Sequence, residues 1–118
     1  MIPYSKQYID KNDIENVKKI LKSNFLTQGP TVEKFENVVK QKCKAKFATA
    51  VNSATSALHL SCLALDLKKG DYLWTSPISF VASANCGLYC GAKIDFVDIC
   101  LDTFNIDVIT LENKLIHA

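Results

Sequence analysis

Residues 70–99, GDYLWTSPISFVASANCGLYCGAKIDFVDI, decide the fold of this 118-residue chain. They begin with a glycine turn and a β-rich run, continue through small residues at helical spacing, and end in a second β-rich run. Strands that alternate with helices of about a dozen residues are typical of βαβ units, in which the strands are parallel. We therefore predict an α/β fold with strands near residues 46–52, 71–75 and 94–98.

Side chains that accept backbone hydrogen bonds mark where the helices around these strands begin. The expected caps and first-turn residues are Asn12 with Glu15 as its capping-box partner, Pro30, Ser79 and Asp107. Apolar residues at helical spacing follow Asn12 and Pro30, and they are expected to face inward. We expect an N-terminal helical segment over residues 1–45, followed by the start of an α/β domain over residues 46–118.

The composition excludes several classes of function. With 48% apolar residues the chain is globular, and a net charge of +2 is too small to indicate a nucleic-acid partner. No run approaches the roughly 18 apolar residues of a membrane span. The five cysteines match no zinc-binding spacing, and Cys86 and Cys90 are expected to be reduced core thiols. These features favour a cytoplasmic protein without a membrane segment.

Residues 51–60, VNSATSALHL, form a candidate phosphate site. A strand end and a turn of small residues lead into a helix start, where free N–H groups and the helix dipole attract an anion. Thr55 and Ser56 add hydroxyl donors there. The spacing matches neither a Walker loop nor GxGxxG. An ordinary Ser/Thr helix cap explains the same residues and is the commoner use of such a motif.

Phe80 is a large ring at the start of the following helix. A ring in this position can stack on a flat cofactor held over the strand ends, although filling of the core is the commoner fate of such a residue. His59 is expected to be a packed or surface residue, because no acid or nucleophile is placed to pair with it. Asp95 and Asp98 fall on opposite faces of a strand, which argues against a metal site.

Taken together, residues 52–99 and the segment DTFNID at 102–107 strongly resemble the DegT/DnrJ/EryC1/StrS family of sugar aminotransferases. The segments IPYSKQYID and SNFLTQGPTVEKFE extend the resemblance to the N-terminus. Members are pyridoxal-phosphate enzymes of the aspartate-aminotransferase fold, fold type I, so the chain corresponds to the N-terminal part of that fold's large domain. The resemblance implies transamination of a UDP-linked 4-keto-6-deoxy sugar with glutamate, by a homodimer, for surface or flagellin sugars such as pseudaminic acid.

The resemblance also implies roles for individual residues. Thr55 and Ser56 would hold the phosphate of pyridoxal phosphate, and Phe80 would stack on its pyridine ring. Four residues fall where the family lines its nucleotide-sugar pocket: Tyr4, Thr27, Gln28 and Gly29. One departure is the phosphate turn, which commonly reads Asn-Gly-Thr in the family and is one residue longer here, a variant that the family also uses.

The lysine that binds the cofactor covalently lies well downstream in the family. None of the 14 lysines here lies in a matching segment. Without it the chain has neither the covalent link to the cofactor nor the base for proton transfer. We therefore expect no catalytic residue within these 118 residues, and an N-terminal fragment that is inactive alone. The alternative is a non-catalytic α/β module that binds a phosphorylated ligand or a partner.

Overall fold

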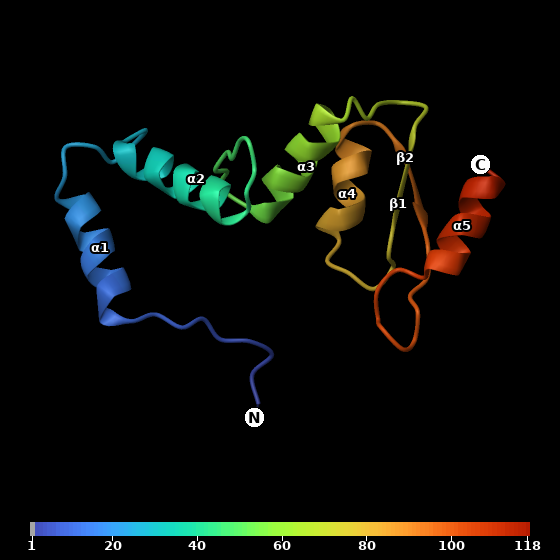
Figure 1. Ribbon diagram of the computed structural model, residues 1–118, viewed down its shortest axis with the longest axis horizontal. Helices are drawn as coiled ribbons and strands as arrows, with labels where there is room; N and C mark the ends of the chain where they lie inside the picture. The colour runs from blue at the N-terminus through green and yellow to red at the C-terminus, as the bar shows by residue number, and fades with distance from the viewer. Residues whose placement is uncertain (1) are drawn as a thin grey trace. The chain divides into compact units, whose positions relative to one another are not determined.

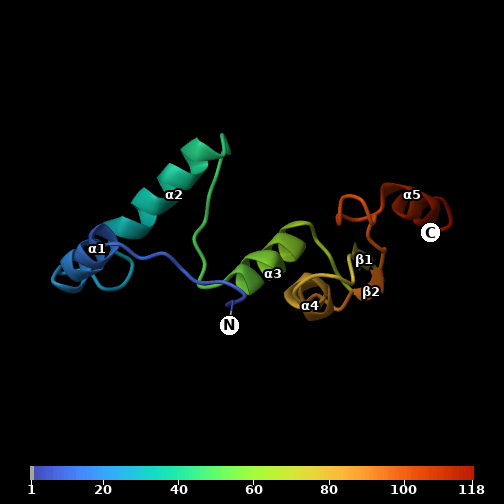
Figure 2. The same cartoon turned by 90° about the horizontal axis from the view of Figure 1, so that it is seen from below.

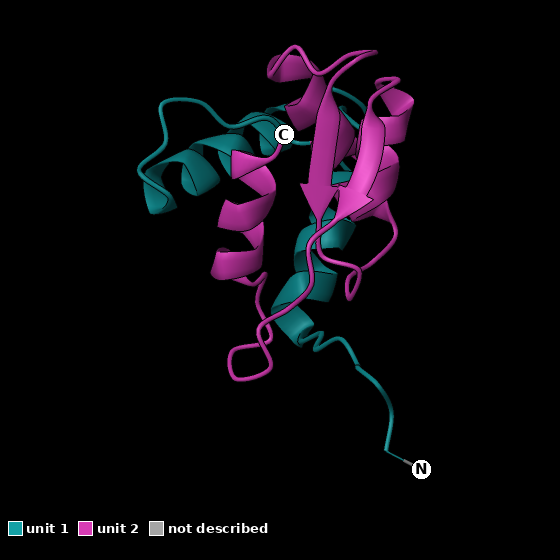
Figure 3. Cartoon of the chain, turned by 90° about the vertical axis from the view of Figure 1, so that its right-hand side faces the viewer, with its two compact units in different colours: residues 1–50 teal, residues 51–118 magenta. Residues whose placement is uncertain are grey.

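The computed structural model describes residues 2–118 and divides the chain into two compact units, residues 1–50 and 51–118 (Figure 3). The first unit holds the helices α1 (Lys11–Leu21) and α2 (Pro30–Lys42). The second holds, in chain order, α3 (Ala54–Ala64), β1 (Tyr72–Thr75), α4 (Ala82–Tyr89), β2 (Lys93–Phe96) and α5 (Val108–Ile116).

The capping box of α1 lies two residues earlier than predicted. Asp10 caps the helix, and its carboxylate accepts the N–H groups of Asn12 at 2.7 Å and Asp13 at 3.0 Å. The Asp13 carboxylate accepts the Asp10 N–H at 3.0 Å in return. The prediction of Asn12 and Glu15 was wrong because two aspartates three residues apart form the same reciprocal pair.

The second helix begins at Pro30, as predicted. Neither α1 nor α2 has a buried residue, so the expectation that their apolar stripes face inward was wrong for the part of the chain described. Val17 and Phe35 are typical of these stripes, and each is 59% exposed. Helices of this kind gain most of their stability from packing of the apolar face, which the contacts within the first unit do not supply.

The two strands of the second unit pair in parallel, with α4 as the connection between them. Tyr72 lies opposite Lys93, and Thr75 lies opposite Phe96. The predicted strands near residues 71–75 and 94–98 and their parallel direction are therefore confirmed. No strand forms over residues 46–52. That prediction was wrong because a strand needs a neighbour for its N–H and C=O groups, and no described segment pairs with this one.

The two faces of the sheet carry different helices, as the view in Figure 2 makes clear. Leu73 and Ile94 point toward Gly87 of α4, and α3 packs against α4 on the same side. The buried hydrophobic residues of the second unit are few and small: Cys62, Ala82, Cys86, Ala92 and the fully buried Val97. Small side chains let the helices come close to each other and to the strands.

Residues Trp74 and Asp95 face α5 on the other side. The Lys114 ammonium lies 2.7 Å from the Asp95 carboxylate and 5.7 Å from the centre of the Trp74 ring, and it donates to the Phe96 carbonyl at 2.6 Å. The hydrogen bond from Lys114 and one from the Phe96 N–H lower the pKa of Asp95. Lys114 thus ties α5 to β2.

The caps of the last two helices differ from each other. Asp107 caps α5 as predicted, and it accepts the Thr110 N–H at 2.6 Å. Ser79 does not cap α4, because Val81 already has helical backbone angles and the Ser83 N–H bonds to the Phe80 carbonyl at 3.0 Å. The Ser79 hydroxyl instead lies 3.1 Å from the Ser83 hydroxyl.

A buried thiol makes the stability of the second unit fall as the pH rises through the alkaline range. Burial, and then the thiols of Cys86 and Cys90, raise the pKa of Cys62 from 9.0 to about 11. The unfolded chain therefore releases this proton first, so the contribution is complete below pH 9 and is lost as the pH rises to 11. We expect the urea midpoint to fall more steeply over this range than in Cys62→Ala, which shares every other titrating group. Parallel curves would contradict this.

Candidate functional site

The candidate site begins at the N-terminus of α3. Ser53 has extended backbone angles and is the cap, and its hydroxyl oxygen accepts the Ser56 N–H at 3.2 Å. Ser53 is therefore the ordinary helix cap that was the alternative to a phosphate site at this motif. Thr55, two residues later, lies in the first turn and is not the cap.

Asn52, Ser53 and Ser56 form a hydrogen-bonded group that we call the serine–asparagine network. The Ser56 hydroxyl donates to the Asn52 carboxamide oxygen at 2.7 Å. The two serine hydroxyls are 3.0 Å apart, so that of Ser53 can donate to that of Ser56. The proton of Ser56 is thus engaged within the network, whereas Thr55 takes no part in it.

The remaining donors at this helix start suit an anion. The intrahelical bonds begin with the Ala57 N–H, which donates to the Ser53 carbonyl at 3.1 Å, so the N–H groups of Ala54 and Thr55 have no acceptor within the helix. The first turn of α3 contains no acidic residue. Two free N–H groups, the Thr55 hydroxyl and the positive end of the helix dipole fit a phosphate group.

The helix starts and the strand ends lie at one edge of the second unit. Figure 1 shows the N-terminal ends of α3 and α4 at the same end as the carboxyl ends of β1 and β2. This edge is where ligands bind in open α/β sheets. The loop of residues 76–81, which leads from β1 to α4, lies at this edge.

Phe80 in this loop is 74% exposed, so it does not fill the core of the described chain. Its ring lines a cavity of about 220 Å³. The other lining residues come from the loop, the start of α4 and the end of β2: Ser76, Pro77, Ser79, Val81, Ser83, Ala84 and Phe96. An uncovered aromatic face beside a small hollow is available for a flat ligand.

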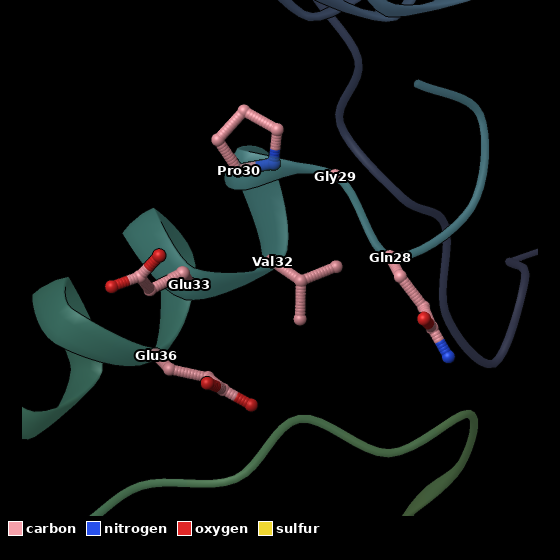
Figure 4. Close-up of a pocket in the computed structure, with 6 residues that line it drawn as sticks. All are labelled: Gln28, Gly29, Pro30, Val32, Glu33 and Glu36. Carbon is pink, nitrogen blue, oxygen red and sulfur yellow. The ribbon is translucent and has the colours of Figure 1, made fainter.

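The predicted sugar-binding residues belong to the first unit and only partly come together. Gln28, which has a positive φ of 50°, and Gly29, the cap of α2, line a hollow of about 450 Å³ (Figure 4). Val32, Glu33 and Glu36 contribute to the same hollow. Tyr4 is fully exposed and lies outside its lining, as does Thr27.

The remaining candidates have structural roles. His59 is half-buried and meets the Tyr89 ring edge-on at 5.2 Å, which confirms that it is a packed residue. Within residues 2–118, no three His, Cys, Asp or Glu side chains are grouped as the ligands of a metal ion would be. None of the helices described is long and apolar enough to cross a bilayer.

Parallel strands joined by a helix place the second unit in the α/β class. The solved structures that match the chain include fold-type I pyridoxal-phosphate sugar aminotransferases. The sugar aminotransferase Spr1654 from Streptococcus pneumoniae, in its PLP form, matches with a TM-score of 0.88 and 31% identity over 95% of this chain and 29% of that one. Residues 7–117 match the DegT/DnrJ/EryC1/StrS aminotransferase family, and the chain belongs to this family of pyridoxal-phosphate enzymes.

Two further aminotransferases match the chain. Helicobacter pylori PseC, an aminotransferase involved in the biosynthesis of pseudoaminic acid, matches with a TM-score of 0.86 and 38% identity over 94% of this chain and 30% of that one. The UDP-4-amino-4,6-dideoxy-N-acetyl-beta-L-altrosamine transaminase of Campylobacter jejuni is 46% identical over 98% of this chain. The chain spans about 30% of the length of the curated relatives it matches first.

Proposed function

We propose that this chain forms the cofactor-phosphate part of an aminotransferase that acts on a UDP-linked 4-keto-6-deoxy sugar with glutamate as amino donor. The observation that carries the proposal is the acid-free first turn of α3, with the Thr55 hydroxyl and two free N–H groups. The named activities of the C. jejuni and H. pylori relatives support an amino sugar of the pseudaminic acid type. A cytoplasmic homodimer remains our prediction.

When bound, pyridoxal phosphate supplies the electron sink that transamination requires. The part of this chain is to hold and orient it. Thr55 would anchor the phosphate by a charge-assisted hydrogen bond. Phe80 would cover one face of the pyridine ring and exclude water from it. Ser56 would act less as a direct ligand than as the residue that fixes Asn52 beside the phosphate, because its proton is already engaged at 2.7 Å.

The hollow at Gln28 suits a sugar better than a diphosphate. Glu33 and Glu36 both line it, and no lysine does. A diphosphate would meet two carboxylates there, and like charges at close range repel. One oxygen of the Glu36 carboxylate accepts the Ala50 N–H at 2.8 Å, which fixes the position of this charge beside the hollow. We infer that Gln28 and Gly29 contact the hydroxyl groups of the sugar ring, with Tyr4 and Thr27 as more distant contributors.

A non-catalytic module that binds some other phosphorylated ligand is the second candidate. The exposed Phe80 ring distinguishes the two candidate functions, because the flat ring of pyridoxal phosphate can stack on it, whereas a phosphorylated ligand without an aromatic ring cannot. Calorimetric titration of the chain with pyridoxamine phosphate, pyridoxamine and inorganic phosphate tests both. Pyridoxamine phosphate forms no covalent bond with lysine, so the 14 lysines do not interfere.

We expect pyridoxamine phosphate to bind more than about 10- to 150-fold more tightly than pyridoxamine, because a single charge-assisted hydrogen bond contributes roughly 1.5–3 kcal/mol and the phosphate accepts from two N–H groups as well as from Thr55. Phosphate alone should bind more weakly than pyridoxamine phosphate, because it cannot stack. Equal binding of phosphate and pyridoxamine phosphate would favour the second candidate. Equal binding of pyridoxamine and its phosphate would contradict both.

A further inference from the structure

The sheet of the second unit consists of two strands, so each strand has one outer edge (Figure 3). The Val97 N–H donates to the Thr75 carbonyl at 3.0 Å, so the backbone groups of Thr75 face β2. Backbone groups alternate in direction along a strand, and the N–H and C=O groups of Tyr72 and Trp74 therefore face the outer edge of β1. Within residues 2–118, no strand lies beside this edge.

The outer edge of β2 is closed by charged side chains. By the same alternation, the backbone groups of Phe96 face outward on β2. The Lys114 ammonium donates to the Phe96 carbonyl at 2.6 Å, and the Asp95 carboxylate accepts the Phe96 N–H at 2.8 Å. Charged side chains at an edge are a common means of preventing its pairing with another chain. On β1, by contrast, Lys93 donates at 3.3 Å to the phenol of Tyr72 and leaves the backbone of that residue free.

The outer edge of β1 is complementary to that of a second copy of the chain. In an antiparallel pair, opposite residues exchange both of their backbone hydrogen bonds where these groups face the partner strand. When Leu73 of both copies lies on a two-fold axis, Tyr72 of each copy is opposite Trp74 of the other. Each of these pairs then exchanges two hydrogen bonds. A shift of the register by two residues would instead require Gly70 or Ser76, which lie outside the strand Tyr72–Thr75.

The side chains favour the same register. Tyr72 and Trp74 share one face of the strand, so a tyrosine ring lies beside a tryptophan ring in both cross-strand pairs, an arrangement that stabilises sheets. On the opposite face Leu73 meets Leu73 of the second copy in a non-hydrogen-bonded pair, where side chains come closest. Asp71 lies opposite Thr75, so no like charges meet. Tyr72 is 56% exposed in the single chain, and pairing would cover part of its ring.

We propose that two copies of this chain associate through the outer edges of β1, which gives one sheet with the strand order β2–β1–β1–β2. The assembly is closed, because each copy uses its unprotected edge and the outer edge of β2 stays blocked by Lys114 and Asp95. The paired strand has only four residues, so the contact is small and the dimer forms at high protein concentration. The proposal rests on the sheet and is independent of the proposed enzymatic function.

Sedimentation equilibrium of the full chain over a wide range of concentrations measures the association. We expect monomers and dimers and no larger species. Hydrogen exchange followed by NMR locates the interface, because the backbone N–H groups of Tyr72 and Trp74 should exchange more slowly at high than at low protein concentration. A chain that stays monomeric throughout would overturn the proposal. A dimer in which these two N–H groups exchange equally at both concentrations would overturn it as well.

The variant Tyr72→Pro tests the backbone contact itself. Proline is tolerated at the first residue of a strand, and the N–H that it removes does not bond to β2. Across the two-fold axis the change removes two hydrogen bonds of about 0.5–1.5 kcal/mol each, so the dissociation constant should rise about 5- to 150-fold. Tyr72→Thr is the matched control, because it keeps the N–H, and its effect should be smaller. Circular dichroism shows whether each variant is folded. If a folded Tyr72→Pro associated as tightly as Tyr72→Thr, the edge of β1 would not be the interface.

Discussion

The substitution Thr55→Ala should lower the affinity of the chain for pyridoxamine phosphate by about 10- to 150-fold and leave its thermal stability unchanged. The loss corresponds to one charge-assisted hydrogen bond of roughly 1.5–3 kcal/mol. Stability should be preserved because the cap of α3 is Ser53, whose hydroxyl accepts the Ser56 N–H at 3.2 Å. Calorimetric titration and a melting curve of the same sample measure the two quantities.

Ser53→Ala is the matched control, because it removes a hydroxyl from the same turn. Its loss should cost roughly 1 kcal/mol of stability, as expected for an N-cap. Its effect on affinity should be smaller than that of Thr55→Ala. If Thr55→Ala instead lowered the melting temperature without changing the affinity, Thr55 would be a structural residue and the phosphate site would lie elsewhere.

The parts of the fold that the sequence predicted are those with local causes. The strands of residues 70–99 and the helix between them follow from apolar patterning and a short connection, and Pro30 and Asp107 mark helix starts through their own side chains. The strand expected over residues 46–52 has the same β-rich composition. It fails to form because strand pairing is non-local, and no described neighbour satisfies its backbone.

The candidate site, too, could be predicted only in part from the sequence. The sequence placed hydroxyls at the start of α3, but it did not show which one is the cap, because Ser53, Thr55 and Ser56 are similar in chemistry. The backbone angles of Ser53 decide this. Asn52 was missed altogether, although its spacing of four residues from Ser56 was a usable signal for a hydrogen bond across one turn.

Exposure could not be predicted from residue type. Its residue type favoured a core position for Phe80 over a cofactor-stacking one, and only the path of the loop after β1 leaves its ring 74% exposed. Likewise, Tyr4 and Gln28 were grouped because the family lines one pocket with them. The hollow at Gln28 depends on the turn into α2 and does not include Tyr4.

Gly87→Val should destabilise the second unit by roughly 1–3 kcal/mol, the usual cost of overpacking a core. A Cβ atom at Gly87 would lie 2.6 Å from Cδ1 of Ile94 and 3.1 Å from Cβ of Leu73. The Ile94 methyl group can rotate away, but the Leu73 Cβ is fixed to the backbone of β1. Relief therefore requires α4 to move off the sheet, and the additional methyl groups of valine increase that displacement.

Leu88→Val is the control for a valine in α4 away from the packed face. Helix propensity does not explain a loss in Gly87→Val, because valine has a higher helix propensity than glycine. Leu88 neighbours Gly87 in α4 and is 55% exposed, so the same valine there meets no strand. Urea denaturation should show a small loss of stability for Leu88→Val and a clearly larger one for Gly87→Val. Equal losses would mean that α4 does not pack closely on β1 and β2. The loop that carries Phe80 would then lack its support, because it leads directly into α4.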